Sequence, residues 1–117
     1  MITRMFSPKV VMNVQGQSVG FVDDLLEVAV SRRASDIHIE PLKDKSRIRL
    51  RVDGLLQPLC DLAKEDHDAV VSRIKVIDGM DITEKRLPQD GHAEKDVGGR
   101  LIDLRVSSMP TITVRKW

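Results

Sequence analysis

The apolar residues in the first half of the chain follow two different periods. After residue 18 they recur at helical spacing, which predicts a helix from an N-cap at Ser18 to near Arg33, where basic side chains suit the negative end of the helix dipole. Residues 36–41 and 47–52 then alternate between apolar and polar side chains, which predicts two half-buried strands. Their apolar positions are Ile37, Ile39, Ile48, Leu50 and Val52.

Turn residues place the next elements. Asp53-Gly54 predicts a two-residue hairpin turn because both positions tolerate positive φ, so residues 55–59 should form a third strand antiparallel to the second. Helical spacing returns in residues 70–77, and Gly79 stands where a left-handed cap ends a helix. The apolar positions of this second helix are Val70, Val71, Ile74 and Ile77.

A hairpin is expected to close the pattern. Residues 87–91 predict a turn-rich loop, and residues 92–97 and 100–107 predict two strands joined at Gly98-Gly99. The buried face of the second strand should consist of Ile102, Leu104 and Val106.

This order of elements predicts an α+β domain. We expect one mainly antiparallel sheet of about five or six strands, covered on one face by two helices. Residues 1–18 show no sustained period and are expected to be a poorly ordered arm or linker, residues 19–112 the domain, and residues 113–117 a separate tail. A length of 117 residues suits one domain.

Charge and composition exclude several classes of function. Nineteen basic and eighteen acidic side chains give a net charge of +1, so the chain has no general attraction for nucleic acid or anionic lipid. Stacking on bases is also disfavoured, because the aromatic residues are Phe6, Phe21 and Trp117. No apolar run approaches the ~20 residues of a membrane span. The first fourteen residues lack a secretion signal, and we therefore expect a cytoplasmic protein that does not span the membrane.

Cysteine and histidine offer little for chemistry. Cys60 is the single cysteine, which rules out an internal disulfide and a cysteine-based zinc site. We expect it to be a small, partly buried residue at a strand end. His67 is expected to lie on the exposed or boundary part of the second helix, where it faces solvent and has no chemical role.

Charged side chains gather on the polar faces of the first two strands. Asp36, His38 and Glu40 stand about 7 Å apart along one strand, a spacing that some metal sites use. The alternative is an ion-pair ladder with the neighbouring strand, and we favour it because one histidine and two carboxylates are weak evidence for a metal. The partners would be Arg47, Arg49 and Arg51, which with Glu40 could also form a docking or anion-binding face.

Arg105 is a separate candidate. Its neighbours Leu104 and Val106 should face the core, so its guanidinium should lie on the opposite face, where it could grip a carboxylate or phosphate through its planar fork. Pairing with Asp103, Asp90 or Glu84 is the alternative on the residues alone.

Five motifs in a fixed order point to a known family. ASDIHIEP, RLRVDG, SRIKV, DITEKRLPQDG and DLRVSSMPT lie between residues 34 and 111, and the chain from about Phe21 to Ile112 resembles the N-terminal region of the type II secretion E proteins and type IV pilus assembly ATPases. The resemblance implies a PAS-like domain that precedes a RecA-like motor domain. It also implies cytoplasmic hexameric rings that hydrolyse ATP with magnesium and act with platform proteins of the inner membrane.

The resemblance also implies a role for one residue. The arginine of the family's DLRVS motif falls on Arg105, which makes it the candidate for a contact with the γ-phosphate. The sequence contains no GxxxxGK[ST] loop, so we expect no cofactor and no catalytic residue in this chain alone, with ATP and magnesium belonging to the full-length family.

Two positions depart from the family pattern. His92 stands where the family has an arginine after PQDG, which removes a permanent cation. Residues 113–117 read Thr-Val-Arg-Lys-Trp where the family continues with an aromatic or histidine, then Gly-Glu-Lys or Gly-Glu-Arg. Loss of one base from TAC GGT GAG AAA ATG G would convert Tyr-Gly-Glu-Lys-Met to this tail, so our hypothesis is a frameshifted, truncated product.

Three functions follow in order of preference. The first is a non-catalytic N-terminal domain that packs on the motor domain and presents Arg105 to ATP. The second is a stand-alone PAS-like sensor or adaptor that docks a protein partner on the arginine face. The third is an enzyme with a metal held by Asp36, His38 and Glu40.

Overall fold

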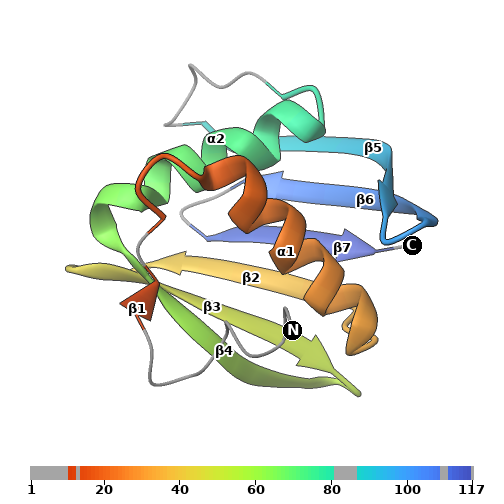
Figure 1. Cartoon of the computed structure of the whole chain (residues 1–117), viewed down its shortest axis with the longest axis horizontal. Helices are drawn as coiled ribbons and strands as arrows, with labels where there is room; N and C mark the ends of the chain where they lie inside the picture. Colours follow the sequence, from red (N-terminus) through yellow and green to blue (C-terminus); the bar gives the residue numbers. More distant parts are fainter. Residues whose placement is uncertain (1–10, 13, 81–86, 109–110, 117) are drawn as a thin grey trace.

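The computed structural model describes residues 11–12, 14–80, 87–108 and 111–116. One open sheet forms the first layer, and helices α1 (Ser18–Ser31) and α2 (His67–Ile77) lie together across one of its faces (Figure 1). The strands are β1 (Val11–Met12), β2 (Asp36–Pro41), β3 (Lys45–Val52), β4 (Leu55–Ala63), β5 (Gln89–Val97), β6 (Arg100–Ser108) and β7 (Ile112–Lys116), with a 3₁₀ turn η2 (Lys64–Asp66) before α2.

The strand order is β1-β4-β3-β2-β7-β6-β5. β1 runs parallel to β4, and the pairs among β2 to β7 are antiparallel. Six antiparallel strands in one open sheet with two helices confirm the predicted α+β class. The sheet is one strand larger than the predicted five or six, because β1 adds a short edge beside β4.

Helix α1 begins one residue away from its predicted cap. Gln17 is the N-cap and makes no side-chain cap bond, while Ser18 is the first helical residue. The reason is that the Gln17 carbonyl already accepts the Phe21 N–H at 3.0 Å. The other end agrees with the prediction, since Arg32 is the C-cap and Arg33 adopts a positive φ of 57°.

The β3–β4 hairpin turns at Asp53-Gly54 as predicted, with positive φ angles of 53° and 79°. β4 extends to Ala63, beyond the predicted end at Leu59. A register shift opposite Ile48 and Arg49 inserts an extra residue, so Leu59 and Cys60 are both buried although they are neighbours. This bulge breaks the alternation from which the end of the strand was predicted.

The predicted loop at residues 87–91 is shorter than expected, because β5 already begins at Gln89. Gly91 is required there for space and not for a turn. A Cβ on this residue would lie 2.7 Å from Met80 Cγ and 3.1 Å from the Asp78 carbonyl oxygen, so the absent side chain lets the end of α2 approach the strand. The Gly98-Gly99 turn is confirmed, with φ angles of 58° and 84°.

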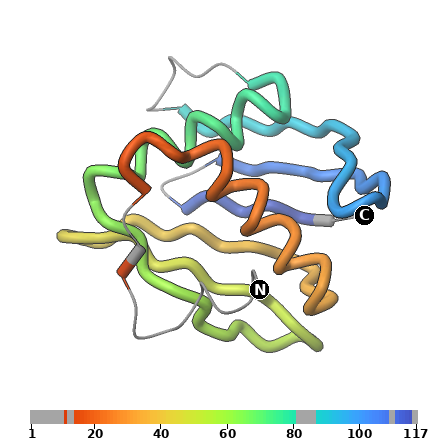
Figure 2. Tube along the Cα trace, viewed as in Figure 1, coloured from red at the N-terminus to blue at the C-terminus, as the bar shows by residue number. Residues whose placement is uncertain are grey.

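Two strands extend the sheet beyond the expected limits of residues 19 and 112. Residues 11–12 pair with Asp61 and Leu62 of β4, within the segment expected to be a poorly ordered arm. Residues 112–116 form β7, which lies between β2 and β6 although β2 is far away in the sequence (Figure 2). Val114 of the expected tail is only 3% exposed, so this segment contributes to the core.

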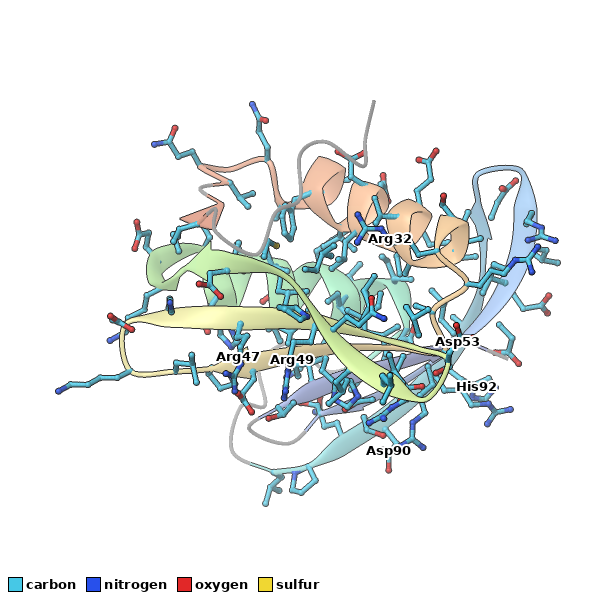
Figure 3. All side chains as sticks on the ribbon, turned by 90° about the horizontal axis from the view of Figure 1, so that it is seen from below. Arg32, Arg47, Arg49, Asp53, Asp90 and His92 are labelled. Atoms are coloured by element: carbon cyan, nitrogen blue, oxygen red, sulfur yellow. The ribbon has the colours of Figure 1, made fainter. Side chains whose placement is uncertain are left out.

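The core fills the space between the helices and one face of the sheet. The apolar residues predicted for β2, β3 and β6 point into it, and Val52 and Ile102 lie at its margin. Charged residues occupy the other face of the sheet, which we call the helix-free face. Arg47, Arg49, Asp90 and His92 all lie on the side of the sheet away from α1 (Figure 3).

Candidate anion-binding and interface face

The registers of the strands align charged residues in one row across the helix-free face. Arg51 of β3 is opposite Asp36 of β2, and Asp36 is opposite Arg115 of β7. Arg115 is in turn opposite Arg105 of β6, and Arg105 is opposite His92 of β5. The row contains three guanidiniums, one carboxylate and one imidazole, from five adjacent strands.

β2 and β3 carry the predicted ion-pair ladder. Arg47 donates a hydrogen bond to Glu40, and Arg49 lies 3.8 Å from the same carboxylate. Arg51 Nε lies 3.5 Å from Asp36 Oδ2. Two carboxylates therefore face three arginines in the order that the alternation of the two strands indicated.

The metal hypothesis gains no support from this geometry. His38 Nε2 lies 3.5 Å from Asp36 Oδ2, but Glu40 is directed to Arg47 and Arg49. Within the described part of the chain, no group of three or more histidine, cysteine, aspartate or glutamate side chains is placed to hold a metal ion.

Arg105 lies on the helix-free face, as the alternation of β6 predicted. Its side chain is 53% exposed, and Nη2 lies 3.8 Å from Asp103 Oδ2. Asp103 stands two residues away on the same strand, so this contact keeps the guanidinium at the surface. Arg105 can be reached from outside, which the opposite arrangement under the core would have prevented.

An open groove of about 280 Å³ surrounds Arg105. Its polar lining consists of Asp90, His92, Arg105, Ser107 and Arg115, from β5, β6 and β7. Arg115 is the residue that sequence reasoning missed, because it lies in the segment expected to be a tail. Its side chain is 57% exposed, and Nε lies 3.9 Å from Asp36 Oδ2.

Two polar contacts of buried groups were also not predicted. The Val14 N–H donates to Asp66 Oδ2 at 2.7 Å, which ties the start of α1 to the start of α2. The Ser46 hydroxyl and His67 Nδ1 form a hydrogen bond. His67 is half-buried, which fits the boundary position and not the solvent-facing one that was favoured. Burial lowers its pKa despite the opposing effect of Asp68. The sequence signal that could have predicted this contact is Ser46 itself, a short polar residue at a position of β3 where the alternation places a buried side chain.

No helix in the described residues is long and apolar enough to cross a bilayer.

The fold and the charged row define the class of this protein: an α+β domain whose open sheet face is available to bind an anion or a protein partner. Comparison with known proteins identifies the family within this class. Residues 13–116 match the family described as "Type II/IV secretion system protein". The chain belongs to this family, and it corresponds to the N-terminal domain of its secretion and pilus-assembly members.

Three relatives illustrate the match. The chain is 50% identical over 93 residues to the type II secretion system protein HxcR of Pseudomonas aeruginosa, which covers 80% of this chain and 20% of that protein. It is 45% identical over 92 residues to the type IV pilus assembly ATPase PilB of Thermus thermophilus, covering 79% and 10%. Against the type II secretion system ATPase E of Vibrio cholerae the identity is 42% over 93 residues, covering 80% and 18%. The chain thus spans a fifth or less of the length of these relatives.

Proposed function

We propose that this chain serves as the N-terminal domain of a type II secretion or type IV pilus assembly ATPase, where it packs on a RecA-like motor domain and presents Arg105 to bound ATP. The observation that carries the proposal is the family match over residues 13–116 to proteins named as secretion and pilus ATPases. The exposed position of Arg105 on the helix-free face supports its part in this role.

The other groups that phosphoryl transfer requires would have to come from the motor domain. A backbone cradle, a lysine and a magnesium site must surround the β- and γ-phosphates, and this sequence has no phosphate-binding loop to supply them. ATP and magnesium therefore belong to the motor domain in this proposal. An arginine from a second domain would add positive charge where negative charge develops in the transition state.

The same proposal assigns partners and location. The domain would contact its motor domain, neighbouring subunits of a hexameric ring and platform proteins of the inner membrane, from the cytoplasmic side. An open charged sheet face and a separate helical face give it two surfaces for such contacts.

A chimera tests the proposal. The matching region of a relative such as HxcR is replaced by this chain, and ATP hydrolysis is compared between the chimera and its Arg105→Gln variant. We expect the variant to lose at least about tenfold in rate, since removal of one preorganised donor from a phosphoryl-transfer site costs this much or more. The isolated chain should show no turnover of ATP.

Arg49→Gln is the matched control, because Arg49 lies on the same face and faces Glu40. It should leave the rate of the chimera within about twofold. Equal rates for the Arg105→Gln chimera and its parent would contradict the proposed role of Arg105, and ATP hydrolysis by the isolated chain would contradict the non-catalytic role. If this chain binds a motor domain with the same affinity in the presence and absence of nucleotide, the adaptor function would instead be favoured.

A further inference from the structure

The segment that leads into α1 has a small pairing surface with the rest of the domain. Residues 11–12 and 14–17, which we call the strap, run from the outer edge of the sheet to the start of α1 (Figure 1). β1 is the outermost strand, and it pairs with only Asp61 and Leu62 of β4. Because so short a ladder at a sheet edge contributes few hydrogen bonds, the closed position of the strap depends on other contacts.

One carboxylate fixes the middle of the strap. The Val14 N–H donates to Asp66 Oδ2 at 2.7 Å, and the Gln15 N–H donates to Asp66 Oδ1 at 3.4 Å. Asp66 and Val14 are both only 7% exposed, so the shorter hydrogen bond is shielded from water. A hydrogen bond to an ionised acceptor is roughly twice as strong as one between neutral groups. Asp66 therefore provides a strong attachment of the strap to the start of α2.

The backbone of the strap opposes this closed position. Gln15 has a positive φ of 45°, which is unfavourable for a residue with a Cβ other than asparagine or aspartate. Gly16 follows with a φ of 85°, and the Gln17 N–H closes the turn by donating to the Val14 carbonyl at 3.0 Å. The closed strap thus combines a strained turn with the attachment to Asp66.

The rest of the helix layer has its own packing. α1 contributes Phe21, Val22 and Leu25 to the core, and α2 contributes Val70 and Ile74. None of these residues belongs to the strap. Loss of the strap would therefore remove Val14 from the core and leave the contacts of the two helices with the sheet in place.

The strap covers part of an edge that has little other protection. Between Leu55 and Cys60, β4 has no charged residue, Leu55 is 68% exposed, and Pro58, which lacks an N–H, is the residue that limits pairing. The opposite edge, β5, carries charged side chains of the kind that discourage pairing with other chains. They are Asp90, Glu94, Lys95 and Asp96.

We propose that the strap opens as one unit while the rest of the domain stays folded, that its opening uncovers the whole edge of β4, and that the Asp66 carboxylate is the latch that keeps it closed. The open state gives β4 (Leu55–Ala63) an unpaired backbone along its outer side. The inference is independent of the proposed function, because neither a phosphate contact nor a motor domain enters it.

Hydrogen exchange of the full chain, followed by NMR in increasing urea below the unfolding transition, tests the strap. We expect the amides of Val14 and Gln17 and the protected amides of β1 to share one opening equilibrium. This opening should occur at least about tenfold more often than that of core amides such as Leu25, and it should depend little on urea because it exposes little surface.

Two variants separate local opening from global unfolding. Ile39→Val, at a position of β2 that is 0% exposed, should increase core exchange about threefold or more and leave strap exchange unchanged. Asp66→Asn keeps the shape of the side chain without its charge, and it should increase strap opening about tenfold. Gln15→Gly relieves the positive φ and should reduce strap opening about threefold.

Several results would overturn the inference. Strap amides that respond to urea and to Ile39→Val as the core does would show that the strap opens only when the domain unfolds. Different opening equilibria for β1 and Val14 would show that the strap is not one unit. Strap exchange at the wild-type value in Asp66→Asn would show that Asp66 is not the latch. If Asp66→Asn does not fold, unchanged strap exchange in Gln15→Gly would count against a strained, closed strap.

Discussion

Burial changes the chemistry of individual side chains in this domain. It raises the pKa of the Cys60 thiol to about 12, with a smaller contribution from the charge of Asp61. It also raises the pKa of the Asp78 carboxyl to about 6, where Asp103 adds to the effect and His92 opposes it. Cys60 was predicted to be partly buried at a strand end, but it is 1% exposed and lies within β4. Asp78 was not singled out by its sequence pattern, because burial of a polar group depends on what packs over it.

Cys60 should be inert in the folded protein. Its side chain is 1% exposed and its high pKa leaves almost no thiolate at pH 8, so a thiol reagent should react at least ~100-fold more slowly than with the unfolded chain. The measurement is the rate of modification with and without urea. Similar rates in both conditions would mean that β4 opens readily around this residue.

Asp78 should make stability depend on pH. Its pKa is about 6 in the folded state against 3.8 for the free group, so between these values the folded state binds more protons than the unfolded state. Its contribution to stability therefore falls as pH rises from about 4 to 6 and stays low above that. Urea unfolding of Asp78→Asn should be less dependent on pH in this range and more stable than the wild type at pH 7.

The comparison of interest is the difference between Asp78→Asn and the wild type, because other carboxyl groups titrate in the same range. Neither oxygen of Asp78 has a hydrogen-bond partner among the described residues, so an amide should be accepted at this position. An identical pH slope in the two proteins would show that Asp78 is ionised without cost.

Among the elements, those defined by local signals were predictable. Asp53-Gly54, Gly79 and Gly98-Gly99 end their elements as predicted because positive φ is a property of a few residues. The ends of β4 and β5 were not predicted. A bulge at Leu59 and the close approach of Met80 to Gly91 depend on neighbouring elements and have no local signature.

Asp66 joins two elements, and its removal should loosen both. The Val14 N–H and the Gln15 N–H donate to its two oxygens at 2.7 and 3.4 Å, so Asp66→Ala leaves the buried Val14 donor without a partner. We expect a loss of about 1–3 kcal/mol in unfolding free energy. Asp44→Ala, at an exposed turn, is the control and should change it by less than ~0.5 kcal/mol. Equal urea midpoints for the two variants would contradict this role.

In the whole molecule, β7 connects two groups of strands. It pairs with β2 on one side and β6 on the other, so it joins the β1-β4-β3-β2 half of the sheet to the β6-β5 half. This placement also explains which part of the candidate site was predictable. Alternation within β6 located Arg105, but the register between β6 and β7 placed Arg115 beside it, and pairing between strands cannot be inferred from the period of one strand.

A charge in the middle of β7 should disrupt the whole sheet. Val114 is 3% exposed, so Val114→Asp would bury a carboxylate without a partner, at a cost comparable to the total stability of a small domain. We expect loss of dispersed amide resonances throughout the protein. Leu101→Asp, at a position that is 69% exposed, should leave the NMR spectrum largely unchanged. A spectrum that retained β2 to β4 intact in Val114→Asp would mean that the halves fold independently.

The central position of β7 has a consequence for biosynthesis. Translation proceeds from the N-terminus, so β7 emerges after every other strand of the sheet, and until then β2 and β6 each present an unpaired backbone edge. Exposed edges of this kind invite pairing with other chains. The nascent polypeptide should therefore depend on chaperones until β7 pairs with β2 and β6 and completes the sheet. This dependence should be greater than is usual for a domain of this size.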